Sequence, residues 1–316
     1  MTITAIAHPN IALIKYWGKR NIEYNLPSVS SLSMTLSHFC TRTSVQWDTK
    51  HDLFILNGER QAAAAAKKVF AFLDRIDPHR PFCTVESHNN FPTAAGLASS
   101  SSAFAALALA GTAAAGISYS KEQLSILARQ GSGSACRSLW GGWVRWDKGR
   151  LDDGSDSHGT PIAPENHWDV CMIIAVVSAE KKSTSSTKGM QQSAKTSPYY
   201  AAWVENAEED VRTAEAALLK HDIHTLGTCM EHSTIKMHAT MMTTRPTIRY
   251  WKPKSLALIE LVEALRNQGF SCYQTMDAGP NVKILCPKDE AEEIAAHVRN
   301  ITQCHILEPG PDAYLC

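Results

Sequence analysis

Four short segments of this chain carry side chains that a compact apolar core does not need. In the first, residues 10–20, Lys15 and Lys19 lie in an otherwise apolar, strand-like run beside Tyr16 and Trp17. A lysine among apolar neighbours must find an anionic partner or lose its proton. A lone lysine more often reaches solvent along its stem, but this alternative is weaker for two lysines in one run.

A second charged segment ends a strand-like run with Asp277, just before a tight turn. A carboxylate at such a place can take the proton of an alcohol. A single Asp more often caps the turn that follows it. The residue type alone therefore leaves both explanations open.

The run from Asn89 to Ser102 has the composition of a phosphate-binding loop. A proline, small residues around Gly96 and four consecutive serines lead into an alanine-rich helical stretch. Such a loop lets backbone N–H groups approach an anion, and the positive end of the following helix favours negative charge. We therefore predict that it binds a nucleotide triphosphate. The predicted nucleotide-binding residues are Asn90, Pro92, Gly96, Leu97, Ala98, Ser99, Ser100 and Ser101.

Alternatives to this prediction are limited. A turn whose serines cap a helix is the simpler explanation of the same residues. The spacing differs from GxxxxGK[ST], and no lysine follows the glycine, so the P-loop fold is excluded. The sequence also lacks a GxSxG elbow and a kinase-type catalytic loop, so serine-based covalent catalysis has no support.

The fourth segment, residues 131–138, combines hydroxyls, flexible backbone and the guanidinium of Arg137. Such a set can hold phosphate or carboxylate, with the arginine making two parallel hydrogen bonds. A helix-ending glycine turn followed by a surface arginine is an equally good explanation when the segment is considered alone.

Composition and charge exclude several classes of protein. With 31 basic and 31 acidic residues, the formal net charge is zero, so no general field attracts nucleic acid or an anionic membrane. No apolar run approaches the roughly 20 residues that a membrane-spanning helix needs. Nine cysteines form no CxxC pair, and the first residues do not resemble a signal peptide. We therefore expect a protein of the reducing cytoplasm.

Short strands and helices alternate along the chain, which predicts an α+β protein with two lobes. Its 316 residues suffice for two domains, and we place them at residues 1–168 and 169–316, after a polar loop over residues 152–164. Strands are expected at residues 43–47, 53–56, 83–86, 143–146, 170–177, 271–276 and 282–286. Helices are expected at residues 60–76, 98–115, 121–130, 199–221, 224–241, 254–268 and 289–298. The polar segment 178–198 is expected to be a loop over a site.

The histidines do not indicate a metal site. His221, His224, His232 and His238 lie near acidic residues, but their spacing matches neither HExxH nor a Cys-His finger. We interpret them as helical surface and core residues, and we expect no metal ion held by protein ligands alone.

Taken together, the segments 10–20, 89–102, 131–142, 181–190 and 276–281 resemble the diphosphomevalonate decarboxylase family of the GHMP superfamily of small-molecule kinases. The pairing of Ser-Gly-Ser-Ala-Cys-Arg at 132–137 with Asp-Ala-Gly-Pro-Asn at 277–281 is specific to the decarboxylase branch. The resemblance implies the GHMP kinase fold, with a ribosomal-protein-S5-like N-terminal lobe and a ferredoxin-like α/β C-terminal lobe. The active site would lie in the cleft between them.

The resemblance also implies a reaction. ATP would phosphorylate the tertiary 3-hydroxyl of 5-diphosphomevalonate, and this phosphate would then leave together with carbon dioxide to give isopentenyl diphosphate. Asp277 would orient and deprotonate the hydroxyl, Lys15 would neutralise charge beside it, and Arg137 would hold the substrate carboxylate. Because a tertiary alcohol does not ionise at neutral pH, a base and a nearby cation are both useful.

Other residues match the ligand-binding positions of the family. Ser100 would lie against the ATP phosphates, where Mg²⁺ would share the charge, and the segment with Ser185 would cover the same site. A homodimer is expected as well. The residues that match those near the substrate diphosphate are Tyr16, Lys19, Ser132 and Ser134.

Some positions depart from the family pattern, namely His88, the pair Ser101-Ser102 in place of alanines, and Thr275-Met276. None of them removes a named catalytic group. Two other functions remain open: a related enzyme acting on 5-phosphomevalonate or mevalonate, as decarboxylase or 3-kinase, and a non-catalytic nucleotide sensor. Retention of Lys15, Asp277 and Arg137 argues against the sensor, because binding alone does not require a base.

Overall fold

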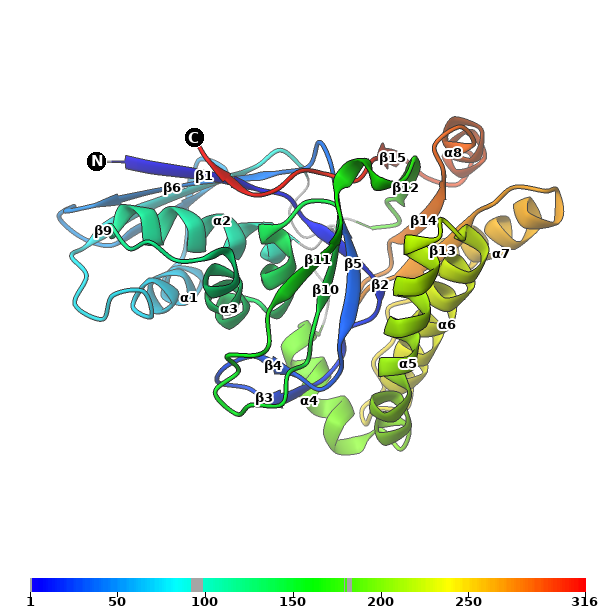
Figure 1. The fold of residues 1–316 in the computed structure, drawn as a ribbon, viewed down its shortest axis with the longest axis horizontal. Coiled ribbons are helices and arrows are strands. Elements are labelled where there is room, and N and C mark those ends of the chain that lie inside the picture. Colours follow the sequence, from blue (N-terminus) through cyan, green and yellow to red (C-terminus); the bar gives the residue numbers. More distant parts are fainter. Residues whose placement is uncertain (1, 92–98, 179, 181–183) are drawn as a thin grey trace.

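The computed structural model describes residues 2–91, 99–178, 180 and 184–316. The described strands form four sheets, and helices pack against them (Figure 1). The expected α+β class is thereby confirmed. The domain boundary between residues 168 and 169 stays a prediction. One buried cluster contains residues from both sides of it, namely Leu32 and Trp143 before it and Met172 and Leu285 after it.

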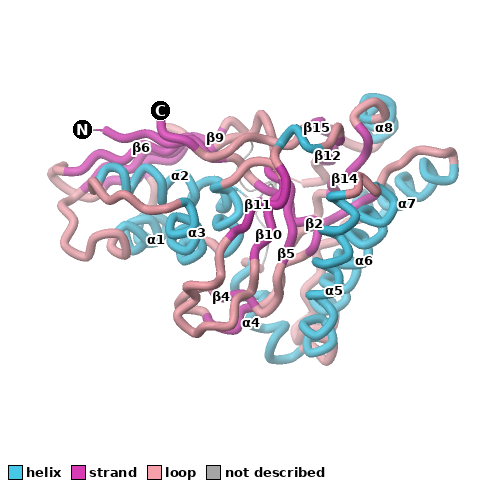
Figure 2. The backbone as a smooth tube through the Cα atoms, in the orientation of Figure 1, coloured by secondary structure: helices cyan, strands magenta, loops and turns pink. Residues whose placement is uncertain are grey.

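The first sheet has the strand order β16-β1-β6-β9-β7-β8 and is antiparallel except for the β7–β9 pair. Helices α1, α2 and α3 gather on one side of it (Figure 2). The alternating burial of β6 explains this arrangement, since its inward residues meet the alanine-rich α2. The strands are β1 (Thr2–Ala7), β6 (Thr41–Trp47), β7 (Leu53–Leu56), β8 (Glu59–Arg60), β9 (Cys83–Asn89) and β16 (Tyr314–Leu315), and the helices are α1 (Ala63–Leu73), α2 (Ser99–Ala114) and α3 (Lys121–Gly131).

The second sheet has the order β11-β10-β5-β2 and lies at the centre of the molecule (Figure 1). Its strands β2 and β5 are buried along their whole length, because the sheet is covered on both faces. Gly142 opens β10 with φ +63°, and a Cβ there would lie 2.4 Å from the carbonyl oxygen of Ala163, so the turn requires glycine. The strands are β2 (Asn10–Ile14), β5 (Ser31–Thr35), β10 (Trp143–Trp146) and β11 (Gly159–Ala163), next to the 3₁₀ helix η1 (Gly133–Leu139).

Smaller elements complete this part of the chain. They are the two-stranded sheet of β3 (Lys19–Asn21) and β4 (Leu26–Pro27), and the 3₁₀ helix η2 (Glu165–His167).

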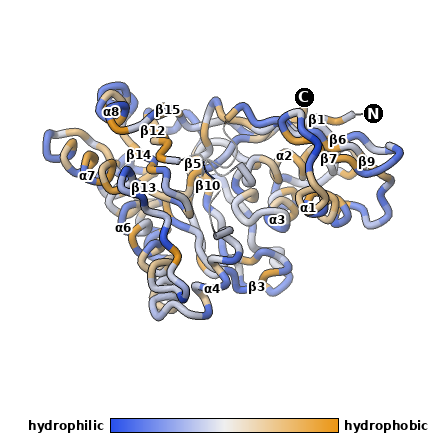
Figure 3. Tube along the Cα trace, turned by 180° about the vertical axis from the view of Figure 1, so that it is seen from behind, coloured by the Kyte–Doolittle hydropathy of each residue, from blue (hydrophilic) through white to orange (hydrophobic). Residues whose placement is uncertain are grey.

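The third sheet has the order β13-β14-β12-β15, with all neighbours antiparallel. Alternate residues of β14 separate its two faces: Val282 and Ile284 pack in the cluster with α7 and α8, whereas Leu285 packs in the cluster with α5 and α6. Strand β12 is apolar throughout and lies among the orange stretches of Figure 3. The elements are β12 (Val170–Ala175), β13 (Tyr273–Met276), β14 (Val282–Pro287), β15 (Cys304–Leu307), α5 (Tyr200–Leu219), α6 (Ile223–Met242), α7 (Pro253–Asn267) and α8 (Ala291–Arg299).

Two expectations about loops were wrong. The segment 178–198 contains the helix α4 (Ser186–Thr196), because Ser185 caps its first turn and Met190 is buried beside Trp17. The polar segment 152–164 contains β11, whose pairing with β10 overrides its turn-rich composition. Strands β1, β5 and β15 were not predicted either, because each is stabilised by pairing with a strand that is distant in the sequence.

Candidate active site

The ends of two sheets bring together a lysine, an aspartate and a second lysine. Lys15 follows β2, Asp277 follows β13, and Lys283 belongs to β14. The Nζ of Lys15 lies 2.8 Å from Oδ1 of Asp277, and the Nζ of Lys283 lies 3.0 Å from Oδ2. Both lysine side chains are buried, at 1% and 0% exposure, whereas that of Asp277 is 27% exposed. The carboxylate is therefore the most exposed member of this cluster.

The pKa values of Lys15 and Asp277 depend on their burial and on the neighbouring charges. Burial lowers the pKa of Lys15 to about 8, against the opposing attraction of Asp277 and with the help of the neighbouring Lys283 and Arg137. Burial alone would raise the pKa of Asp277, but the ammonium groups of Lys15 and Lys283 outweigh it and hold that pKa well below its ordinary range. At neutral pH the aspartate is therefore a carboxylate and Lys15 is an ammonium.

Arg137 is buried beside this cluster without an acidic partner among the described residues. Its Nε and Nη2 donate to Oδ1 of Asn10 at 3.1 and 3.0 Å, and its Nη1 donates to Oγ of Ser31 at 2.6 Å. Three of its five N–H groups are thereby used, which leaves one on each terminal nitrogen. A forked donor of this kind, rigidly held by neutral groups, suits a carboxylate or phosphate ligand.

A second buried arginine shows what a structural role looks like. Arg129 donates through Nε and Nη1 to the backbone carbonyls of Tyr24, Gly154 and Ser157, while its Nη2 is buried without a hydrogen-bond partner among the described residues. Arg137 instead donates to side chains, those of Asn10 and Ser31. This contrast favours the ligand-binding explanation for Arg137.

Tyr16 and the segment 131–138 lie against one another. The Tyr16 ring packs edge-on against Trp146 with centroids 4.6 Å apart, and a Cβ on Gly133 would lie 2.9 Å from Oη of Tyr16. The Tyr16 hydroxyl is buried and has no hydrogen-bond partner among the described residues. An orphaned hydroxyl in such a place is costly unless a ligand meets it.

The predicted phosphate-binding serines are brought next to this segment. Oγ of Ser132 donates to Oγ of Ser100 at 3.2 Å, which joins the segment to the first turn of α2. Ser100 is exposed, whereas Ser101 is buried and accepts a 3.5 Å hydrogen bond from the backbone of Asn10. The backbone oxygen of Ser134 accepts a hydrogen bond from Asn10.

The remaining predicted residues are placed as follows. Lys19 donates to Oδ1 of Asn25 at 2.5 Å, and burial, then the nearby Lys68, lowers the pKa of Lys19 to about 8. Asn90 bridges the backbone of His38 and Cys40, and Ser185 accepts from the backbone N–H of Lys188. Ser99 begins α2. Pro92, Gly96, Leu97 and Ala98 lie outside the described residues.

Family comparison agrees with this geometry. Residues 7–159 match the family model of the diphosphomevalonate decarboxylase-like N-terminal domain. Residues 172–308 match that of the mevalonate 5-diphosphate decarboxylase C-terminal domain. The chain belongs to the diphosphomevalonate decarboxylase family.

Members of the family from distant organisms are similar over most of their length. Diphosphomevalonate decarboxylase mvd1 of Aspergillus fumigatus is 40% identical over 94% of this chain and 80% of its own. The human diphosphomevalonate decarboxylase is 38% identical over 94% of this chain and 79% of its own.

Solved structures of the family have the same fold. The mevalonate diphosphate decarboxylase of Enterococcus faecalis superposes with a TM-score of 0.93 at 41% identity, covering 100% of this chain and 99% of that one. The Staphylococcus aureus enzyme has a TM-score of 0.94 at 37% identity, covering 100% and 98%. The expected GHMP kinase fold is thereby confirmed.

Three residues beside the site of this family member were not predicted from the sequence. They are Asn10 and Ser31, which hold Arg137, and Lys283, which holds Asp277. Lys283 had a readable signal, since it interrupts the apolar strand 282–286 just as Lys15 interrupts its own run. Asn10 and Ser31 carry no such signal, because small polar residues are common at strand ends.

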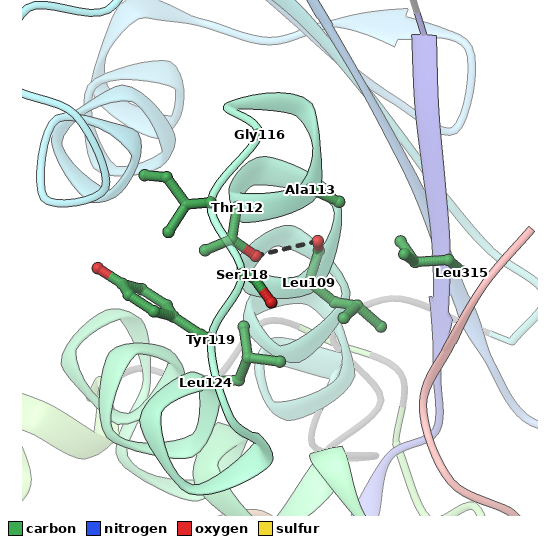
Figure 4. A pocket seen from close by; sticks show the side chains of 9 residues that line it. Leu109, Thr112, Ala113, Gly116, Ser118, Tyr119, Leu124 and Leu315 are labelled. Atoms are coloured by element: carbon green, nitrogen blue, oxygen red, sulfur yellow. Dashed lines mark hydrogen bonds between the residues drawn. The ribbon is translucent and has the colours of Figure 1, made fainter.

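Other parts of the described structure do not bring together charged or metal-binding side chains in this way. A pocket at the C-terminal part of α2 is lined by Leu109, Tyr119 and Leu315 among others, and none of its lining side chains is Asp, Glu, Lys or Arg (Figure 4). Within the described ranges, no three His, Cys, Asp or Glu side chains gather as metal ligands. No helix in the described part of the chain is both long and apolar enough to cross a membrane.

Proposed function

We propose that this protein catalyses the ATP-dependent decarboxylation of 5-diphosphomevalonate to isopentenyl diphosphate, with release of ADP, phosphate and carbon dioxide. The observation that carries the proposal is the ion pair of the buried Lys15 with the partly exposed Asp277, beside an arginine that has no acidic partner among the described residues. A further solved structure of the same fold, MDDEF in complex with MVAPP, AMPPCP and magnesium, has a TM-score of 0.94 at 42% identity. Its ligands are an analogue of ATP and the proposed substrate.

In the first step, Asp277 accepts a hydrogen bond from the tertiary 3-hydroxyl. The hydroxyl oxygen forms a bond to the γ-phosphorus, and the bond from that phosphorus to the bridging oxygen breaks, leaving ADP. A carboxylate whose pKa is held this low is a weak base. The proton therefore passes to Asp277 late, as the forming O–P bond acidifies the alcohol, while the Lys15 ammonium offsets the charge on the transferring group.

In the second step, the 3-phosphate departs with the electrons of its C–O bond. The carbon–carbon bond to the carboxylate breaks, its electrons form the double bond, and carbon dioxide leaves. Arg137 orients the carboxylate through its two spare N–H groups, held in place by Asn10 and Ser31. Orientation of this kind, rather than covalent chemistry, is what the protein contributes here.

The anionic ends of the two ligands would be bound by the remaining predicted residues. We assign the substrate diphosphate to Tyr16, Lys19, Ser132 and Ser134. Among the described residues, the Tyr16 hydroxyl has no hydrogen-bond partner and the Lys19 ammonium has no acidic partner, so both can bind an anion. The ATP phosphates lie at Ser100, at the start of α2, where the N-terminal N–H groups of a helix point at an anion.

Mg²⁺ is compatible with this donor set. The ion commonly arrives bound to phosphate oxygens and needs few protein ligands, so the lack of a three-residue cluster among the described residues is no obstacle. The exposed Ser100 hydroxyl is an oxygen donor of the preferred type. When bound, Mg²⁺ would spread the charge of the triphosphate.

We further propose two domains at residues 1–168 and 169–316, a homodimer and a cytoplasmic location. Symmetric dimers are the commonest assemblies of soluble enzymes. All nine cysteines are free, which suits a reducing compartment. Light scattering on the purified protein tests the dimer, since a mass near 34.7 kDa would contradict it.

One assay tests the function and its alternatives. The protein is incubated with Mg²⁺-ATP and, separately, with mevalonate, 5-phosphomevalonate and 5-diphosphomevalonate, and both ADP and carbon dioxide are measured. We expect both products from 5-diphosphomevalonate. Formation of ADP without carbon dioxide would instead identify a 3-kinase, and turnover of another substrate would change the assignment.

A further inference from the structure

Lys283 occupies a place where a charged side chain is unusual. It lies in β14, paired with Thr275 of β13 on one side and Ile174 of β12 on the other. Its neighbours Val282 and Ile284 point into the cluster beneath α7 and α8, so Lys283 points to the opposite face. Its side chain is 0% exposed. An ammonium so deeply buried is costly without a charged partner.

That partner is the far oxygen of Asp277. Nζ of Lys283 lies 3.0 Å from Oδ2 and 3.3 Å from the carbonyl oxygen of Asn281, which belongs to the turn after Asp277. Since Lys15 binds Oδ1, each carboxylate oxygen holds one ammonium. The two ion pairs together oppose rotation of the carboxylate about its own axis, which a single pair would permit.

The second lysine also changes the net charge around the carboxylate. The charged and titratable groups that face Asp277 in the described structure are Lys15, Lys283, Arg137 and His238. Burial and then Lys15 lower the pKa of His238 to about 3, so this histidine is neutral. Three buried cations therefore face one carboxylate, and the cluster as a whole carries a net positive charge.

We propose that Lys283 is a positioning residue of the reaction, which fixes the orientation of the Asp277 carboxylate toward the reacting hydroxyl. This inference rests on the proposed function. Lys283 acts through Asp277, because its ammonium is fully buried behind the carboxylate. The chemistry of the site then depends on both ion pairs and not on the Lys15–Asp277 pair alone.

The first test compares Lys283→Met with Lys288→Met. Methionine keeps the length of the stem without the charge, and the control removes a half-exposed lysine that pairs with Glu308 near the same strand. For Lys283→Met we expect kcat to fall by about tenfold or more, with the KM for ATP nearly unchanged. Lys288→Met should behave as wild type.

Unchanged kcat in folded Lys283→Met would overturn the proposal. If this variant fails to fold, Lys283→Gln keeps a hydrogen-bond donor at the same place and is measured in the same way. The same result, a lower kcat with the KM for ATP nearly unchanged, is expected for it.

A second test uses thermal unfolding and needs no turnover. In wild type, Lys283→Met should lower the melting temperature because it breaks an ion pair. In an Asp277→Asn background the same change should raise the melting temperature, because it removes a buried charge that has lost its partner. Equal shifts of the melting temperature in both backgrounds would contradict the pairing of Lys283 with Asp277.

The proposed function and this pairing can fail separately. If the wild-type protein shows no turnover of 5-diphosphomevalonate, the proposed function is wrong, and the melting temperatures still decide whether Lys283 pairs with Asp277.

Discussion

Single buried charges decide the chemistry of this protein. Asp277 is a carboxylate between two ammonium groups, and Arg137 is held by an amide and a hydroxyl rather than by an acid. Removing one member of such a set leaves the others uncompensated, which costs more than the loss of an exposed pair. Each residue can therefore be tested by a substitution that changes charge or shape alone.

Asp277→Asn should lower kcat by about 10²-fold or more while ATP binding stays nearly intact, because the alcohol loses its proton acceptor. Steady-state kinetics and calorimetric titration with an ATP analogue measure the two effects. Asp52→Asn is the matched control, since Asp52 is also 27% exposed and also pairs with a buried cation, Arg80. A variant of Asp277 that kept most of its rate would remove this residue from the mechanism.

Arg137→Lys keeps the charge but loses the fork, so we expect kcat to fall by about 10-fold or more and the carboxylate to be poorly oriented. Arg129→Lys alters a buried arginine that donates only to backbone carbonyls among the described residues. It should lower the melting temperature and leave kcat per folded molecule unchanged. Equal kinetic loss in both variants would indicate that Arg137 has a structural role.

The pH dependence follows from the lowered pKa of Lys15, about 8 in the free protein. Below this pH the ammonium is present and the enzyme is active, and as pH rises through 8 the charge and the rate should be lost together. The limb should appear in kcat/KM and lie higher in kcat, since bound anions stabilise the ammonium. Lys19 titrates in the same range, so the limb must persist in Lys19→Arg to be assigned to Lys15.

At the scale of elements, local patterns predicted most helices and the apolar strands. The long helix expected over residues 199–221 is α5, and the strand expected over residues 170–177 is β12. Elements whose stability comes from distant partners were missed. Strand β11 depends on β10, and α4 depends on the burial of Met190 against Trp17 and its neighbours.

The site was predictable to a similar extent. Lys15 and Asp277 were found by residue type and by family resemblance, and the structure joins them across 262 positions of sequence. Lys283 was not predicted, because the other residues of its strand are apolar and the local pattern indicates only a buried strand. The placement of Asn10 beneath Arg137 could not be read from sequence, since it depends on β2 and η1 packing together.

Gly133 is an element-scale test of the turn between α3 and η1. A Cβ there would lie 2.9 Å from both Oη of Tyr16 and the Trp146 ring. We expect Gly133→Ala to displace Tyr16 and raise the KM for 5-diphosphomevalonate by about 10-fold, roughly the effect of losing one hydrogen bond to a charged group. An unchanged KM would show that Tyr16 does not bind the substrate.

At the scale of the whole molecule, one buried cluster spans both predicted domains. It contains Leu32 and Trp143 from the central sheet together with Met172 and Leu285 from the third sheet. Because these residues lose their packing together, we expect the full chain to unfold in one transition. Coincident melting curves from near-ultraviolet and far-ultraviolet circular dichroism would agree. Two separated transitions would show that the domains are stable independently.

The central claim is that an alcohol held at Asp277 beside Lys15 is phosphorylated by ATP and that the product then loses carbon dioxide. The most direct measurement is the ratio of carbon dioxide to ADP released from carboxyl-labelled 5-diphosphomevalonate by the wild-type protein. We predict equal amounts of the two products throughout the reaction. ADP that accumulates without carbon dioxide, or no ADP at all, would contradict the account.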